Sequence, residues 1–335
     1  MMRTLATMVG AGIPLHRALG ILAEQMPDNE QARVESMALQ LQRGHSFSST
    51  VASHPDLFGP LHRALLKVGE MTGGLVRLLD RLADYDEKNE ALRGRLRSRL
   101  TYPAVLFVVA CLAMLVLPPL VLEGMLGILA SSPQPPPLLT QLVIKLASLL
   151  RNPVFVVGAV ALGVAGLGAG RQLWANRSLR LATYRLVEGL PVAGRVVRQV
   201  SQARFCDALG LQLMVGVPPL QALPLAAAAT ANPLWEEDIA RAIRALEEGA
   251  TVAEALEVMA VVDPLLVSLV AVGEESGKLS EILTRAGVAF EQSVEHSVEV
   301  LTSLAEPLTL FFMGCIFAVL IVATMLPMVQ LVENL

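Results

Sequence analysis

The sequence predicts an all-α membrane protein that consists of two duplicated cytoplasmic helical bundles, of about six helices each, and three transmembrane helices. Three observations lead to this fold class. One motif occurs twice at a fixed separation, three apolar stretches are long enough to cross a bilayer, and no stretch shows the period-two alternation of a half-buried strand. Each element is justified below in chain order.

The duplication is marked by the motif G-E-x-[ST]-G-x-L, which occupies Gly69–Leu75 and, 204 positions later, Gly273–Leu279. Two copies at one offset indicate a repeated structural unit. A second motif has the same offset, with Pro14 in Gly-Ile-Pro matching Pro218 in Gly-Val-Pro. Further matches are Ala18 with Ala222, Leu19 with Leu223, Leu79 with Leu283, Arg81 with Arg285, Glu87 with Glu291, and Pro103 with Pro307.

The composition indicates a membrane protein with soluble parts. Of the 335 residues, 54% are hydrophobic and 17% are charged, and the mean hydropathy is +0.57, which is too apolar for a soluble globular chain. A net charge of −4 and only 4% aromatic residues give no support for nucleic-acid binding. The three cysteines, at 111, 206 and 315, show no C-x-x-C spacing and favour a reduced protein without a metal site.

In the first repeat, residues 1–100, helix starts and stops are read from proline, glycine and capping residues. A helix starts near Pro14, and Asp28 or Asn29 caps the next one, which ends at Gly44. Ser46 caps a short helix, and a further helix begins at Pro55-Asp56 and reaches Gly69. After Gly73-Gly74 a long helix begins at Leu75 and runs towards the membrane. Its acids Asp84, Asp86, Glu87 and Glu90 are expected to form a solvated face.

The second repeat, residues 172–305, contains the same kinds of signal. Proline and glycine punctuation predicts successive helices at 195–215, 218–229, 233–248, 252–259 and 263–273, followed by a long helix at 279–303. The two long helices occupy equivalent positions in the two repeats and lead into Pro103 and Pro307.

The membrane segments divide the rest of the chain. We expect transmembrane helices at 101–122, 153–171 and 306–332, with a periplasmic connection at 123–152 that contains a proline-rich turn. Arg93, Arg95, Arg97 and Arg99 precede the first segment, and a second arginine cluster follows residue 170. Positive residues mark the cytoplasmic side, so the N-terminus is expected to be cytoplasmic and the C-terminus periplasmic.

The stretch Gly-Glu-Glu-Ser-Gly-Lys at 273–278 resembles a phosphate-binding loop but lacks its features. Only three residues separate the glycines, Leu279 follows the lysine where a hydroxyl should be, and the first repeat has Gly74 in place of Lys278. The better interpretation is a corner between two helices. Gly69 and Gly273 are expected to adopt the positive φ of a helix C-cap, and Thr72 and Ser276 to cap the following helix. Gly73, Gly277, Pro14 and Pro218 complete the predicted structural turns.

A bare corner does not need an acid, yet Glu70 and Glu274 occupy the same position in both copies. They are therefore the candidate partner-binding residues. An alternative is a membrane enzyme or transporter in which Glu70 and Glu274 form the site. No catalytic residue, metal site or cofactor is otherwise predicted, because the five histidines are not paired and the spans contain no buried acid or base of the kind that transporters use.

The paired Gly-[Ile/Val]-Pro and G-E-x-[ST]-G-x-L motifs, together with Thr101-Tyr102-Pro103 and Glu306-Pro307 at the spans, resemble the type II secretion F / type IV pilus inner-membrane platform family. The resemblance covers nearly the whole chain. Members usually carry a further segment ahead of the first repeat, whereas this sequence starts almost at Gly12.

This resemblance implies a non-enzymatic scaffold in the bacterial inner membrane that is itself oligomeric. Its cytoplasmic bundles would meet a hexameric assembly ATPase, and its spans would meet pilin or pseudopilin and other inner-membrane assembly proteins.

Overall fold

A computed structural model describes residues 1–130, 141, 145, 177–190 and 193–333. Within these residues every regular element is a helix, as the sequence predicts. By their contacts the residues fall into two units, one of residues Met1–Arg95 with Leu181–Ser297 and one of residues Leu96–Arg180 with Val298–Leu335. The first unit contains both sets of short helices.

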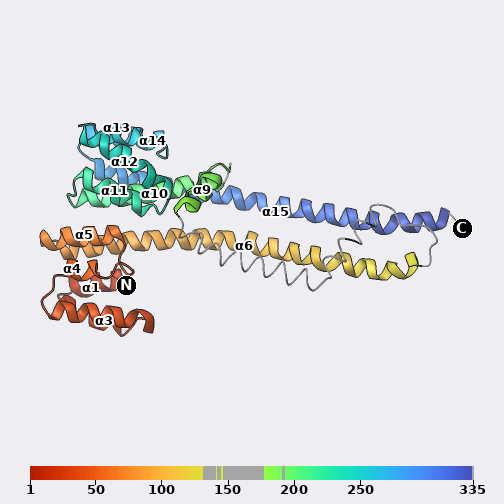
Figure 1. Cartoon of the computed structure of the whole chain (residues 1–335), viewed down its shortest axis with the longest axis horizontal. Helices are drawn as coiled ribbons and strands as arrows, with labels where there is room; N and C mark the ends of the chain where they lie inside the picture. Colours follow the sequence, from red (N-terminus) through yellow and green to blue (C-terminus); the bar gives the residue numbers. More distant parts are fainter. Residues whose placement is uncertain (131–140, 142–144, 146–176, 191–192, 334–335) are drawn as a thin grey trace. The chain divides into compact units, whose positions relative to one another are not determined.

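The first set consists of five short helices and the start of a long one (Figure 1). They are α1 (Met2–Gly10), α2 (Leu15–Ala23), α3 (Asp28–Gln42), α4 (Phe47–Ala52), α5 (Pro60–Met71) and α6 (Leu75–Ala130). Ser46 caps α4 as predicted, because its hydroxyl accepts a hydrogen bond from the Ser49 amide at 3.1 Å. The core between these helices is apolar, and Leu5, Leu19, Met37, Leu65 and Leu79 are fully buried.

The second set has the same order of elements after one preceding helix, α9 (Arg177–Glu188). It contains α10 (Ala193–Met214), α11 (Pro219–Ala229), α12 (Pro233–Glu247), α13 (Val252–Glu257), α14 (Pro264–Glu275) and α15 (Leu279–Glu333). The predicted helix positions are therefore confirmed to within a few residues. Trp235 and Phe205 pack in its core with ring centroids 4.5 Å apart.

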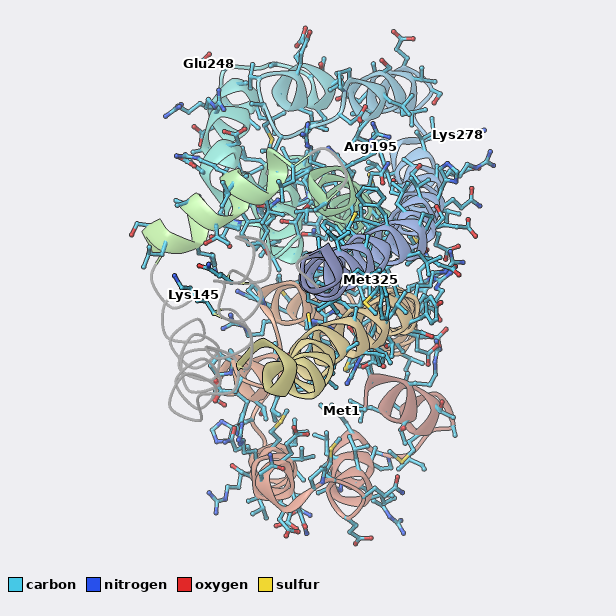
Figure 2. All side chains as sticks on the ribbon, turned by 90° about the vertical axis from the view of Figure 1, so that its right-hand side faces the viewer. Met1, Lys145, Arg195, Glu248, Lys278 and Met325 are labelled. Carbon is cyan, nitrogen blue, oxygen red and sulfur yellow. The ribbon has the colours of Figure 1, made fainter. Side chains whose placement is uncertain are left out.

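Matched positions of the two sets are buried in the same way. Leu19 and Leu223 are both fully buried, and so are Leu79 and Leu283. Three pairs of glycines with positive φ end helices at matching places: Gly12 with Gly216, Gly44 with Gly249, and Gly73 with Gly277. Apolar side chains face inward, whereas charged residues such as Glu248 and Lys278 extend from the outer edge (Figure 2).

One expected helix start and one expected helix cap in the first set are wrong. The helix expected at Pro55-Asp56 begins at Pro60, because residues 53–59 form a turn that buries Phe58 and proline favours the first helical position. The start of α3 has no side-chain cap; Asp28 lies in its first turn, where an acid suits the helix dipole, and Pro27 occupies the N-cap position.

The long helices α6 and α15 continue into the predicted spans without a break at Pro103 or Pro307. Two described segments are long and apolar enough to cross a membrane, Leu75–Ala113 within α6 and Leu279–Ala323 within α15. The segment Leu75–Ala113 includes part of the first predicted span, and Leu279–Ala323 includes part of the third. The second predicted span, 153–171, and most of the connection at 123–152 lie outside the described residues.

Candidate functional site

The two candidate glutamates occupy equivalent places, near the ends of α5 and α14. The Glu70 carboxylate accepts hydrogen bonds from the backbone amides of Phe47 at 2.7 Å and Ser48 at 3.0 Å. The Glu274 carboxylate accepts from Val252 at 2.7 Å and Ala253 at 2.8 Å. In each repeat, the glutamate thus reaches back to the start of the short helix that precedes its own.

These contacts supply hydrogen-bond acceptors for the N-terminal amides of α4 and α13. The first amides of a helix have no acceptor within the helix. Glu70 takes the first two amides of α4, and the Ser46 hydroxyl takes the third. In α13 the Thr251 hydroxyl accepts from Glu254, whose side chain accepts in return from the Thr251 amide, as in a capping box. A carboxylate placed at a helix N-terminus also interacts favourably with the helix dipole.

The hydrogen bonds affect the charge state of Glu70. Partial burial raises the pKa of its carboxyl group, but the hydrogen bonds from Ser48 and the Phe47 amide outweigh this and hold the pKa below its usual value. Glu70 therefore remains an anion, whose two oxygens are both engaged. Glu70 and Glu274 bond within their own helix sets, and no hydrogen bond or ion pair in the described residues joins them.

The glycines of the corner divide into two roles, which corrects the prediction for Gly69 and Gly273. The positive φ values belong instead to Gly73 (68°) and Gly277 (67°), which reverse the chain after each helix. Gly69 and Gly273 lie inside their helices and allow close packing. A Cβ on Gly69 would lie 2.6 Å from Leu78 Cδ2, and one on Gly273 would lie 3.0 Å from Leu279 Cα.

The corner hydroxyls also act differently from the prediction. Thr72 Oγ1 donates to the Val68 carbonyl oxygen at 2.9 Å, and Ser276 Oγ donates to the Val272 carbonyl oxygen at 2.7 Å. They therefore close the end of the preceding helix and do not cap the next one. Pro14 and Pro218 are the N-cap residues of α2 and α11.

Two groups of ion pairs in the structure were not predicted from the sequence. Arg3 bonds Asp80 at 2.8 Å, Asp84 at 2.5 Å and Glu87 at 2.7 Å, so part of the acidic face of α6 is not simply solvated. A largely buried acid, Asp207, bonds Lys88 Nζ at 3.1 Å.

Burial raises the pKa of Asp207, and the positive charge of Lys88 opposes this shift. Gly287 leaves room for this acid, because a Cβ at that position would lie 2.6 Å from Asp207 Oδ1.

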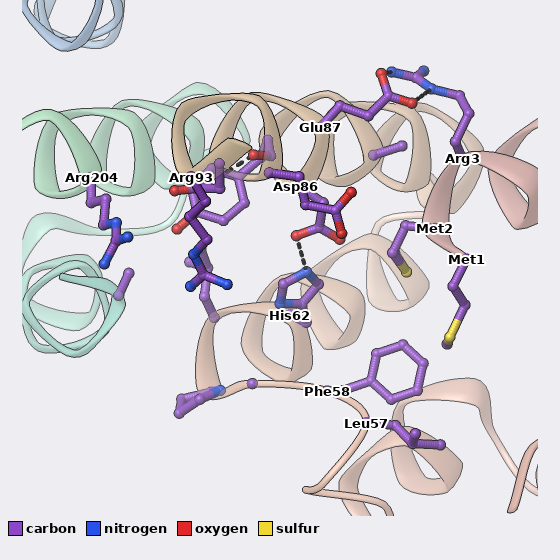
Figure 3. A pocket seen from close by; sticks show the side chains of 18 of the residues that line it. Met1, Met2, Arg3, Leu57, Phe58, His62, Asp86, Glu87, Arg93 and Arg204 are labelled. Carbon is purple, nitrogen blue, oxygen red and sulfur yellow. Dashed lines mark hydrogen bonds and ion pairs between the residues drawn. The ribbon is translucent and has the colours of Figure 1, made fainter. Parts of the chain in front are cut away.

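A pocket of about 520 Å³ lies beside α5 and α6 (Figure 3). In it His62 Nε2 and Asp86 Oδ1 are 2.9 Å apart, and Arg93 and Arg204 line the same space. Its lining contains no serine, threonine or cysteine that could serve as a nucleophile. In the described part of the chain, no group of three or more His, Cys, Asp or Glu side chains is arranged to hold a metal ion.

Comparisons with known proteins point to one family. The sequence model of the family described as "Type II secretion system (T2SS), protein F" matches residues 1–122 and residues 205–327. Similar proteins include the type IV pilus assembly protein PilC of Pseudomonas aeruginosa (30% identical, covering 98% of this chain and 88% of the relative) and PilC of Thermus thermophilus (33%, covering 99% and 82%). Type II secretion system protein F of Pseudomonas aeruginosa is 30% identical, covering 98% of this chain and 81% of the relative.

These matches extend over nearly the whole chain and agree with the sequence resemblance. The two matched segments begin 204 residues apart, which is the offset between the two corner motifs. The chain therefore belongs to the type II secretion system protein F family, which includes the PilC proteins of type IV pilus assembly.

Proposed function

We propose that this chain is the inner-membrane platform of a type IV pilus or type II secretion machine and couples a cytoplasmic assembly ATPase to the polymerisation of pilin or pseudopilin. The observation that carries the proposal is the family match on two segments whose α-helical bundles continue directly into apolar helices. Relatives over 98% of the chain are named as pilus assembly or secretion system proteins.

The proposed architecture follows from the same observations. The two sets of short helices are two copies of one bundle, and each copy is followed by a membrane helix. We propose that the span predicted from the sequence at 153–171, which lies outside the described residues, returns the chain to the cytoplasm, so that both bundles lie on the same side of the membrane. Several copies of the chain assemble in this platform, together with other inner-membrane assembly proteins.

Long continuous helices suit a platform that passes movement between a soluble motor and membrane-embedded subunits. α6 and α15 are each a single helix from the corner to the span. An α-helix is stiff along its length because each residue is hydrogen-bonded to the turn before it. A displacement of the corner is therefore passed along the helix axis and is not absorbed by an intervening loop.

The enzyme or transporter alternative lacks support from the geometry of its proposed site. It requires Glu70 and Glu274 to act as a carboxylate pair, but the oxygens of each accept amide hydrogen bonds from different helices. A general base must reach the proton that it removes. Each carboxylate oxygen accepts an amide hydrogen bond within its own helix set, and in the described residues no hydrogen bond or ion pair brings the two carboxylates together.

Binding of the motor tests the proposed function. The full-length chain in lipid nanodiscs is titrated with the purified assembly ATPase of the same organism, and with a cytoplasmic ATPase from an unrelated pathway as the control. Saturable binding of the assembly ATPase alone is expected. Equal binding of both enzymes, or of neither, would contradict the proposal.

A further inference from the structure

The two duplicated corners lie on either side of one residue, Met214, at the end of α10. A hollow of about 360 Å³ is lined by Gly69, Thr72 and Gly74 of the first corner together with Met214. A second hollow of about 510 Å³ is lined by Gly277 and Lys278 of the second corner, again with Met214. Both corners thus contribute to one continuous surface within the first unit.

This surface is positively charged. Arg77 and Arg81 line the first hollow, and Lys278 and Arg285 line the second. Arg77, Arg81 and Lys278 are exposed, and none forms an ion pair with any described residue. The one acid in the lining of the two hollows, Glu281, is engaged with Arg285 at 2.7 Å.

The stability of the helices does not explain these cations. Arg77 lies in the first turn of α6, and Lys278 directly precedes α15. The N-terminal end of a helix carries a partial positive charge, so that acids stabilise it and cations destabilise it. Two cations without ion-pair partners at two helix N-termini, Arg77 and Lys278, are therefore better explained by a partner than by folding.

An apolar centre accompanies the charges. The Met214 side chain is 47% exposed, and Val68 and Val215 line the hollow next to it. Methionine is flexible and polarisable and adapts to an incoming apolar group. No aromatic side chain lines either hollow, so the stacking platforms typical of single-stranded nucleic-acid sites are missing there.

We propose that the basic corner surface, defined by Arg77, Arg81, Met214 and Lys278, docks an acidic segment of the assembly ATPase that places an apolar side chain against Met214. This inference rests on the proposed function, because that function supplies the cytoplasmic partner. The carboxylates of the partner segment pair with the arginines and the lysine, and the apolar contact at Met214 fixes the register.

The position of the surface along the chain fits a soluble partner. About 28 residues separate Leu75 from Pro103 in α6, and the same number separates Leu279 from Pro307 in α15. That length of α-helix is roughly 42 Å, several times the Debye length at physiological salt. The anionic membrane surface is therefore screened from the corners.

The corner motif then has a divided role. Glu70 and Glu274 hold the corner together from inside, while the basic residues around it make the contact with the motor. The part of the motif that does not repeat, Lys278 in place of Gly74, adds charge to one corner only.

Charge reversal tests this surface. The triple variant Arg77→Glu, Arg81→Glu, Lys278→Glu is compared with a control triple variant, Arg17→Glu, Arg43→Glu, Arg244→Glu, which changes the net charge equally at exposed sites elsewhere. ATPase binding to full-length chains in nanodiscs is measured at low and high salt. The corner triple variant should weaken binding by about ten-fold or more at low salt, and the control by less than about two-fold. Met214→Asp should weaken binding at both salt concentrations.

The outcomes separate the two proposals. If the wild-type chain does not bind the ATPase, the proposed function fails. If it binds and the corner and control variants behave alike, only the docking surface is overturned. A short DNA duplex is titrated in parallel. If DNA binds as tightly as the ATPase and the corner triple variant abolishes both, the surface is a nucleic-acid site and the proposal is wrong. Unchanged melting temperatures of all variants exclude unfolding as the cause.

Discussion

At the scale of single residues, the corner motif is explained by hydrogen bonds that run backwards along the chain. Glu70 and Glu274 each bond the two leading amides of a helix that starts more than 20 residues earlier. A corner that holds such an acid fixes three helices relative to one another, namely its own two and the short helix before them. This gives a physical reason for an acid at both corners in addition to the predicted partner contact.

Removing either carboxylate should destabilise the fold. In Glu274→Ala two buried amides lose their acceptor, and we expect a loss of about 1–3 kcal/mol in the free energy of unfolding. Glu70→Ala should have a similar effect. The measurement is denaturant unfolding of the full-length chain in detergent, followed by circular dichroism. The matched control is Glu275→Ala, an exposed neighbour that should change the free energy by less than about 0.5 kcal/mol.

The same variants test the predicted partner contact of the two glutamates. If Glu274→Ala leaves the unfolding free energy unchanged but abolishes ATPase binding, the carboxylate acts through the partner and the capping role is secondary. Loss of stability with unchanged binding at a temperature where the variant is folded would show the reverse.

The contribution of Glu70 should depend on pH in a defined direction. Its pKa is lowered in the folded chain, so the unfolded chain takes up a proton first as the pH falls. The stabilisation is therefore complete above the unfolded pKa of about 4.3 and is lost as the pH falls through the lower folded value. The difference in unfolding free energy between wild type and Glu70→Gln should shrink as the pH is lowered from about 6 to about 3, the range over which Glu70 titrates. A difference that grows towards low pH would contradict the assigned shift.

The packing glycines give a third prediction at this scale. Gly273→Ala should cost about 1–3 kcal/mol, because its Cβ would meet the backbone of Leu279 at 3.0 Å. Gly69→Ala should cost less, since the atom that it meets is the end of the flexible Leu78 side chain. Gly94→Ala serves as the control. Nothing lies within 4 Å of its Cβ, so this helical site should become more stable by about 0.5–1 kcal/mol. Thermal unfolding of the three variants decides the order.

At the scale of elements, the sequence was sufficient for most helices because their ends carry local signals. Ser46, Pro233 and Gly277 mark a cap, a first turn and a chain reversal that depend on nearby residues only. The start at Pro55-Asp56 was wrong because a second proline, Pro60, competes with it, and burial of Phe58 decides between the two.

The candidate site was harder to predict than the helices. The repeat located the two corners and the two glutamates. It did not show their hydrogen bonds, because the amides that each glutamate accepts from belong to a different helix. Periodicity shows which face of a helix is apolar and does not show which helix that face meets. The roles of Gly69 and Gly73 were exchanged for this reason, since close packing against Leu78 is a tertiary contact. The ion pairs of Arg3 and Asp207 were invisible for the same reason.

At the scale of the whole molecule, the family match and the two helix sets with one order of elements support the proposed platform role. The family match places this chain among secretion and pilus assembly proteins, and each repeat ends in one helix that continues into an apolar segment. The two helix sets differ at a corner position and agree at matched core positions. One corner has Lys278 where the other has Gly74, while the buried positions Leu19 and Leu223 remain the same.

Deletion of the gene tests the proposed platform role. The number of surface filaments, or the amount of secreted substrate, is counted in a deletion strain and in the same strain complemented with the wild-type gene, and the ATPase activity of the purified motor is measured alongside. The account predicts that assembly is lost in the deletion strain and restored by the wild-type gene, while the motor hydrolyses ATP at its normal rate. Normal filaments and normal secretion in the deletion strain would contradict it.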